Sequence, residues 1–197
     1  VLVLTSTFPR WHSDTEPRFV YDLCLGLSAD WDVHVLAPSS PGAETLEKLD
    51  GITVYRYRYA PGRLEDLCYE GGITDKLRTR RWRWLLVGPF LVMGTIGIWW
   101  RLRRDAYDVI HAHWILPQGL QAVVGRALAL RHGTPLLLTS HGADLFGLKG
   151  AAMRALKRWV LRRADRATVV SRAMREQMLA LKPDADPVVA PMGIDAK

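Results

Sequence analysis

Apolar strand-like runs alternate with longer helical patterns, and this alternation constrains the fold more than any other feature of the sequence. Several runs are continuously apolar, which is typical of parallel strands with helices on both sheet faces. The strand-like runs are residues 1–5, 32–37, 52–59, 108–112, 135–140, 167–171 and 187–190. The helical patterns are residues 17–29, 82–104, 117–131, 151–164 and 172–181. We therefore predict an α/β fold with a doubly wound, Rossmann-like parallel sheet.

Length and composition predict a packed, globular chain. It has 197 residues, of which 49% are hydrophobic and 24% charged, enough to bury a sizeable core. Cys24 and Cys68 lack the C-x-x-C spacing of metal or redox sites, which favours a reducing compartment and a cytoplasmic location. The sequence begins at Val1 in a strand-like run and stops on PMGIDAK without a following helix. We expect no signal peptide and a chain shortened at both ends.

The turns that follow the strands are the expected ligand-binding positions. In an open parallel sheet, ligands bind outside the carboxyl ends of the strands. His141 and Gly142 stand at one such end; histidine offers a donor and an acceptor near neutral pH, and glycine lets the backbone approach a ligand. The alternative is a capping or core histidine. These turns are residues 6–16, 37–42, 112–119 and 140–146, Ser171, and residues 190–195.

The first of these turns is long and polar. It carries Arg10, His12, Ser13, Asp14 and Glu16 just before an expected helix start. Backbone N–H groups at a helix N-terminus attract anions, so the turn suits phosphate groups or carbohydrate hydroxyls. The alternative is a solvated loop without a ligand.

Histidines at the end of a neighbouring strand suggest a second kind of function, that of a metal-dependent enzyme. His111 and His113 are two residues apart on a strand and therefore share a face, and Trp114 follows at the strand end. With His141 and Asp144 they offer the ligand types of a zinc site, as in a metal-dependent hydrolase. Zinc ligands are usually grouped more tightly and supported by a second-shell partner. We therefore expect no metal, and one strand histidine buried and hydrogen-bonded.

Other catalytic signatures are missing from the sequence. It has no G-x-G-x-x-G after the first strand, no G-x-x-x-x-G-K-[ST] and no G-x-S-x-G. Their absence disfavours a dinucleotide dehydrogenase, a P-loop NTPase and a serine hydrolase.

The formal net charge of +7 predicts an anionic partner. An apolar stretch from Trp84 to Trp100 has basic residues on both sides and contains Pro89 and three glycines, which should break the helix pattern. A membrane span here would separate the strand at 108–112 from the earlier strands, so we reject it. Two interpretations of this stretch remain open: a core helix with a basic collar, and a helix that rests on an anionic membrane. In the second case the chain could also be a non-catalytic module that docks on the membrane. The basic residues are Lys76, Arg78, Arg80, Arg81, Arg83, Arg101, Arg103 and Arg104.

A second basic segment is expected to be an exposed helix face. Arg154, Arg158 and Arg162 recur at intervals of four residues, which places them on one side of a helix. The sequence carries no helix-turn-helix, zinc-finger or RNA-binding aromatic signature. We therefore expect no nucleic acid as a partner.

Six stretches, in order over nearly the whole chain, resemble the N-terminal half of GT-B glycosyltransferases of family 4. This large retaining group includes bacterial transferases for cell-envelope glycans and lipid-linked sugars. The pair VIHAHW and SHGADLF is the most specific part of the resemblance. The stretches are VLVLTSTFPRWHSDTEPRFVYDL, DVHVLAP, DVIHAHWILPQG, PLLLTSHGADLF, RRADRATVVSRAMRE and VAPMGID.

The resemblance implies one half of a GT-B fold. Residues 1–190 would form the acceptor-side Rossmann-like domain and residues 191–197 the start of the interdomain linker, with the donor-binding C-terminal domain outside this chain. The activity implied is transfer of a sugar from a nucleotide-diphosphate sugar to a hydroxyl of a glycan or lipid-linked acceptor, with retention at the anomeric carbon. No metal or other cofactor is implied. Because the other half holds most of the donor, we expect this chain alone to be inactive.

The same resemblance assigns site residues. His141 is the expected catalytic residue, in contact with the donor sugar or the reacting centre, and His113 flanks the acceptor side. The first turn lacks the glycine pair that family members often carry. The other expected binding residues are Arg10, His12, Asp14, Glu16, Trp114, Gly142, Asp144 and Gly193. A peripheral position on the inner face of the membrane is compatible with such a transferase.

Overall fold

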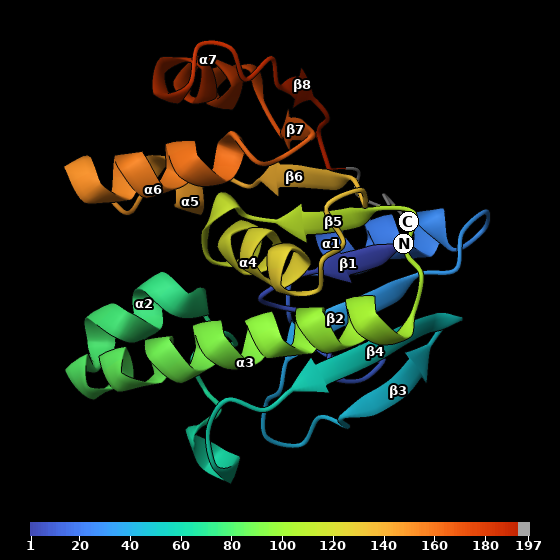
Figure 1. Ribbon diagram of the computed structural model, residues 1–197. Coiled ribbons are helices and arrows are strands. Elements are labelled where there is room, and N and C mark those ends of the chain that lie inside the picture. Colours follow the sequence, from blue (N-terminus) through green and yellow to red (C-terminus); the bar gives the residue numbers. More distant parts are fainter. Residues whose placement is uncertain (193–197) are drawn as a thin grey trace.

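The computed structural model describes residues 1–192, which form one eight-stranded sheet with helices on both faces (Figure 1). The strands are β1 (Leu2–Leu4), β2 (His34–Pro38), β3 (Leu46–Leu49), β4 (Ile52–Tyr57), β5 (Ile110–His113), β6 (Leu136–Ser140), β7 (Arg166–Val169) and β8 (Val188–Val189). The helices are α1 (Phe19–Leu27), α2 (Gly72–Thr79), α3 (Trp84–Arg104), α4 (Leu120–Leu128), α5 (Ala143–Phe146), α6 (Ala151–Leu161) and α7 (Arg172–Leu181). Short helical turns span Gly62–Leu64, Arg81–Arg83 and Ile115–Gly119.

The sheet has the order β3-β4-β2-β1-β5-β6-β7-β8. All neighbouring strands are parallel except β3 and β4. The chain first builds outward from β1 through β2 to β4, then returns to the other side of β1 and continues through β5. Strand order therefore reverses between β1 and β5, which is the switch point where doubly wound sheets bind ligands. The predicted fold is confirmed.

Two apolar cores lie on opposite faces of the sheet. On one face, Val3 and Val35 pack against Val20 and Cys24 of α1. On the other, Leu4 and Leu138 pack with residues of α3, α4 and α6, including Ile98. Successive strand residues point to opposite faces, so strands covered on both sides are mostly apolar at successive positions. This is why the runs read as continuously apolar in the sequence.

Three elements were not predicted: β3, α2 and α5. Only Leu49 of β3 is buried, and α2 buries no side chain at all. An element without a buried face leaves no apolar periodicity in the sequence. The third, α5, has four residues, too few to show a period.

Helix α3 is continuous through Pro89, so the expectation that this proline and the glycines break the helix is wrong. Proline removes the hydrogen bond to the carbonyl four residues earlier. That carbonyl belongs to Leu85, which is 77% exposed, so water reaches this turn. Gly94 and Gly97 face Gln121 and Leu36, and they allow α3 to pack closely on α4 and the sheet.

By length and composition α3, with the turn before it, could cross a membrane. It connects β4 to β5, and both strands belong to one sheet on either side of β2 and β1. A spanning helix would put these strands on opposite sides of a bilayer. The rejection of a membrane span is therefore consistent with the topology.

Candidate functional site

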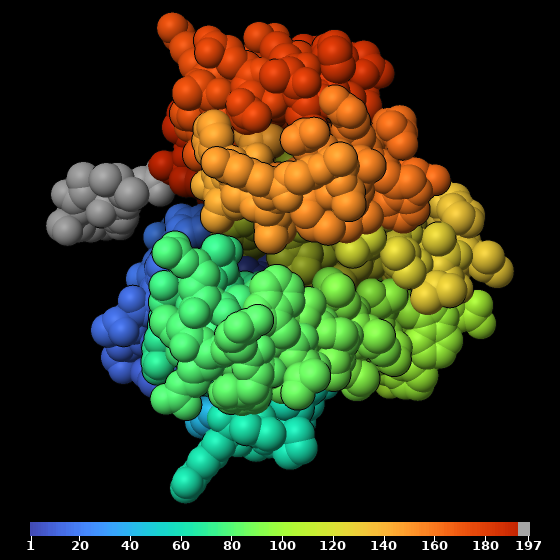
Figure 2. Space-filling model, turned by 90° about the vertical axis from the view of Figure 1, so that its left-hand side faces the viewer, coloured from blue at the N-terminus to red at the C-terminus, as the bar shows by residue number. Residues whose placement is uncertain are grey.

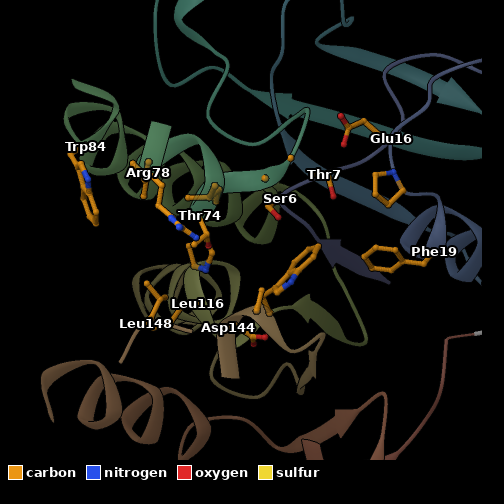
Figure 3. Close-up of a pocket in the computed structure, with 18 residues that line it drawn as sticks. Ser6, Thr7, Glu16, Phe19, Thr74, Arg78, Trp84, Leu116, Asp144 and Leu148 are labelled. Atoms are coloured by element: carbon orange, nitrogen blue, oxygen red, sulfur yellow. The ribbon is translucent and has the colours of Figure 1, made fainter. Parts of the chain in front are cut away.

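A cavity of about 610 Å³ lies at the carboxyl ends of the strands, next to the switch point (Figure 3). Ser6 and Thr7 follow β1, Trp114 and Leu116 follow β5, and Asp144 follows β6. Helix α2 and the start of α3 close the opposite side. Figure 2 shows this face of the molecule hollowed between the green α2–α3 region and the orange region after β6. The cavity is lined by Ser6, Thr7, Glu16, Pro17, Phe19, Gly71, Gly72, Ile73, Thr74, Leu77, Arg78, Trp84, Trp114, Leu116, Pro117, Ala143, Asp144 and Leu148.

Three of the predicted binding turns meet in this cavity. They are the turns after β1, β5 and β6, whose strands are neighbours in the sheet. The turns at residues 37–42 and at Ser171 contribute no lining residue. The convergence follows from topology, because parallel strands place their carboxyl ends at one edge of the sheet.

The Trp114 backbone has an unusual conformation. Its φ of 72° and ψ of 133° are rare for a bulky residue, because Cβ clashes with the backbone at positive φ. Two hydrogen bonds hold it: its N–H donates to the Thr139 carbonyl at 2.7 Å, and its carbonyl accepts from the Gly119 N–H at 3.0 Å. Such strain is concentrated at ligand sites, and here it turns the indole into the cavity wall.

Three histidines stack behind this wall. The rings of His111 and His113 lie 4.3 Å apart, and those of His113 and His141 lie 5.1 Å apart and nearly parallel. His113 Nδ1 and His141 Nε2 share a hydrogen bond of 2.8 Å. His111 Nε2 is 2.7 Å from Thr139 Oγ1. Both strand histidines are buried, where we had expected one.

Burial keeps these histidines neutral. It lowers the pKa of His111 and of His141 to about 4, and in His141 the neighbouring His111 adds to the effect. Burial lowers the pKa of His113 well below its usual value, and the other two histidines lower it further. Between two neutral rings, one nitrogen donates and the other accepts. The shared hydrogen bond therefore couples the tautomer of His141 to that of His113 and leaves Nδ1 of His141 as its other polar atom.

His141 lies beside the cavity without lining it. Its ring is 4.8 Å from that of Phe19 and 4.9 Å from that of Trp114, both of which are wall residues. Gly142 follows with a φ of 104°, which a residue with a side chain rarely adopts. The tight turn at Gly142 brings Ala143 and Asp144 onto the wall. The catalytic role of His141 stays a prediction.

Asp144 ties two of the turns together. Its carboxylate accepts hydrogen bonds from the Ile115 N–H at 2.6 Å and from the Ser140 hydroxyl at 2.8 Å. Burial raises the pKa of Asp144, an effect that these hydrogen bonds oppose. Asp144 thus fixes the turn after β5 relative to the turn after β6, and it also borders the cavity.

The first turn contributes fewer contacts than its composition predicts. Arg10 and Asp14 pair with each other through two hydrogen bonds between their side chains, at 2.8 and 2.9 Å. The Arg10 guanidinium holds the pKa of Asp14 down to about 2. His12 is exposed and lies 3.5 Å from Asp50. None of these three lines the cavity, whereas Glu16 does, while accepting a hydrogen bond from the Glu70 N–H at 2.7 Å.

The most informative residues missed from the sequence are Phe19, Thr74, Arg78 and Trp84 (Figure 3). Thr74 and Arg78 lie on α2, which had not been predicted. The sequence indicated Arg78 only as one of the basic residues beside the apolar stretch, and Trp84 only as the first residue of that stretch. The remaining prediction, Gly193, lies outside the residues that the structure describes, as does most of the predicted linker.

The histidine cluster does not have the form of a metal site. Within residues 1–192, no group of three His, Cys, Asp or Glu side chains is arranged to hold a metal ion. The rings stack instead of pointing their nitrogens at one point, and two of the nitrogens that would bind a metal pair with each other. The hydrolase alternative gains no support from this arrangement.

Comparison with known proteins identifies the family. Residues 17–193 match the family described as "Glycosyl transferase 4-like domain". No protein of curated function matches the sequence. A solved structure described as trehalose-6-phosphate from E. coli bound with UDP-2-fluoro glucose is similar, with a TM-score of 0.60 and 10% sequence identity, over 98% of this chain and 49% of that one. The chain therefore spans about half the length of that structure and shares its fold, that of a Rossmann-like half of a GT-B glycosyltransferase. Because the family match extends over most of the sequence, the chain belongs to the glycosyl transferase 4-like domain family.

Proposed function

We propose that this chain is the acceptor-side half of a retaining glycosyltransferase. The reaction would move a sugar from a nucleotide-diphosphate sugar to a hydroxyl of a glycan or lipid-linked acceptor. The observation that carries this proposal is the cavity at the switch point between β1 and β5, in a chain of this family. The similar structure is described as bound with UDP-2-fluoro glucose, which supports a nucleotide sugar as the donor.

The chemistry of the cavity suits an acceptor with an apolar part. Aromatic and aliphatic side chains form most of the wall, among them Phe19, Trp114 and Leu77. Arg78, Ser6 and Thr7 add a positive charge and two hydroxyls. Aromatic rings pack on the faces of sugars or lipids, whereas a guanidinium binds phosphate or carboxylate. An amphiphilic acceptor that carries an acidic group would use both.

His141 is the proposed catalytic residue, in contact with the donor sugar or the reacting centre. Its ring packs between Phe19, Trp114 and His113, which limits its movement, and its hydrogen bond to His113 holds its orientation. A neutral imidazole held in one orientation can donate or accept a single hydrogen bond at a defined place. We assign no role to a metal, and we expect this chain alone to give no turnover.

The test uses the whole protein that contains this chain. It would be incubated with a panel of labelled nucleotide-diphosphate sugars, and transfer of the sugar to water would be measured, so that no acceptor need be known. With the productive donor, His141→Ala should lower turnover by about 10²-fold or more, the scale of one positioned polar group. NMR detection of the anomer released first would report retention or inversion.

His132→Ala is the matched control because His132 is exposed on the turn after α4. It should keep both turnover and the thermal transition of the unaltered protein. If His141→Ala keeps near-normal turnover with an unchanged thermal transition, the catalytic role of His141 is wrong. If no nucleotide sugar in the panel is consumed by the unaltered protein, the proposed reaction itself is contradicted.

A further inference from the structure

Helix α3 presents an apolar stripe to solvent. One side of the helix packs on the sheet and on α4 through residues such as Phe90, Ile98 and Leu102, which are about 1% exposed. The opposite side is open along the length of the helix, which lies on the outside of the sheet (Figure 1). We call the following residues the α3 stripe: Trp84 (58% exposed), Leu85 (77%), Val92 (56%), Met93 (37%), Ile96 (44%) and Trp100 (49%).

An apolar surface of this kind is unusual on a helix that faces water. Solvent-facing positions of a surface helix are normally polar or charged. From Trp84 to Trp100 the sequence contains no charged residue, so every turn of the exposed side is apolar. Contiguous exposed apolar patches mark interaction surfaces.

Both ends of the α3 stripe are positively charged. Arg78, Arg80 and Arg81 precede it and Arg103 and Arg104 follow it, all exposed. No Asp or Glu occurs between Lys76 and Arg104. Nearby cations of the collar are neutralised, since Arg83 pairs with Asp66 and Arg101 with Asp105. The five exposed arginines make no ion pair with any residue in the range 1–192.

We propose that the α3 stripe is a docking surface for an anionic phospholipid bilayer. A helix that lies in the membrane interface buries an apolar face and carries basic residues that meet anionic headgroups. Tryptophan favours the boundary between headgroups and acyl chains. Trp84 and Trp100 stand at the two ends of the stripe, about 24 Å apart at 1.5 Å per residue. This spacing places two interfacial anchors along a helix that lies flat.

A second copy of the chain fits this surface less well. Two stripes that pack against each other, whether parallel or antiparallel, bring a basic end against a basic end, because both ends carry unpaired arginines. Like charges brought together repel. A surface that is anionic over its whole area, by contrast, attracts both ends at once. Charge complementarity therefore favours a bilayer.

The docking surface adjoins the cavity. Trp84 belongs to the α3 stripe and also lines the cavity, and Arg78 lies at the same rim (Figure 3). A chain docked through α3 would therefore hold the cavity next to the lipid headgroups. If the proposed function is right, the acceptor is reached from the bilayer. The docking itself does not depend on that function.

The experiment compares binding of this chain to vesicles of phosphatidylcholine mixed with phosphatidylglycerol and to vesicles of phosphatidylcholine alone, by co-sedimentation at low salt. The unaltered chain should bind the anionic vesicles and not the neutral ones. The double variant V92E/I96E replaces two exposed residues of the stripe and should bind at least about tenfold more weakly, because it loses apolar contact and repels headgroups.

The matched control is L25E/V188E. It makes the same change in net charge at residues that are 41% and 60% exposed, on α1 and β8, away from α3. It should bind as the unaltered chain does. Circular dichroism melts would establish that both variants fold.

Three results would overturn the proposal. They are binding of V92E/I96E equal to that of the unaltered chain, an equal loss in both double variants, and equal binding of the unaltered chain to neutral vesicles. A further contrary result is a dimer in solution that V92E/I96E dissociates while neither protein binds vesicles; it would make the stripe an interface between copies.

Discussion

At the scale of single residues, the three stacked histidines should make folding depend on pH. Burial lowers the pKa of His111 and His141 to about 4 and that of His113 well below its usual value, whereas an unfolded histidine titrates near 6.5. Below pH 6.5 the unfolded chain therefore binds more protons than the folded one, and stability falls as the pH falls. Between pH 7 and 5 we expect a loss of about 1–2 kcal/mol per buried histidine.

Urea unfolding of His113→Gln at a series of pH values tests this. The variant lacks one of the three buried imidazoles, so its loss of stability between pH 7 and 5 should be smaller than that of the unaltered chain by about 1–2 kcal/mol. His132→Gln, at an exposed position, should leave the pH dependence unchanged. An identical pH dependence in His113→Gln would mean that His113 is not held neutral.

The sequence predicted which turns meet at the cavity better than it predicted the contacts within them. Topology alone places the ends of β1, β5 and β6 at one edge, so the position of Glu16, Trp114 and Asp144 beside the cavity could be predicted. The pairing of Arg10 with Asp14 could not, because a polar turn looks the same whether its charges face a ligand or each other. The aromatic contacts of His141 also escaped prediction, since Phe19 reaches it from a distant helix.

At the scale of elements, the packing of α3 on α4 depends on glycine. A Cβ atom at Gly125 would lie 2.7 Å from Ile98 Cγ2 and 3.2 Å from the Thr95 carbonyl oxygen. Both neighbours belong to α3, and one is backbone, so the helices would have to separate. We expect Gly125→Ala to destabilise the chain by about 1–3 kcal/mol through overpacking, although alanine favours helix by about 1 kcal/mol relative to glycine.

Gly26→Ala is the control for this change. Gly26 lies within α1, and a Cβ there would meet no atom within 4 Å. The helix propensity of alanine should then act alone and stabilise the chain by about 0.5–1 kcal/mol. Chemical denaturation of both variants measures the difference in sign. Stabilisation by Gly125→Ala as well would show that α3 and α4 pack less closely than the structure has them.

Elements with a buried face were predictable and those without one were not. The apolar runs of β1, β5 and β6 and the patterns of α4 and α7 all follow from burial in the two cores. The charged helix α2 has no such signal, although it closes the cavity. For α3 the sequence predicted a helix but not its environment. An apolar helix can lie in the core, at a membrane interface, or partly in both. The structure shows that one side is buried and the other open.

At the scale of the whole molecule, the sheet separates two surfaces with different properties. The α1 face carries exposed apolar residues singly, such as Leu25 and Trp31. The α3 face carries a continuous apolar stripe between basic ends. A molecule with this asymmetry should meet an anionic surface in one orientation, with α3 against the lipid and the α1 face in water. Docking through α3 therefore fixes the orientation of the molecule on the bilayer. A measurement of binding affinity does not detect this orientation.

Quenching of tryptophan fluorescence by brominated lipids measures that orientation. Trp84 and Trp100 stand at the two ends of the α3 stripe, whereas the exposed Trp31 follows α1, the helix that covers the other face of the sheet. If α3 lies flat on the bilayer, Trp84→Phe and Trp100→Phe should each remove part of the quenching seen with anionic vesicles, because both indoles reach the interface. Trp31→Phe should remove none. Loss of quenching with Trp84→Phe alone would instead mean that the molecule touches the bilayer only at the end that holds the cavity, with the rest of α3 lifted away.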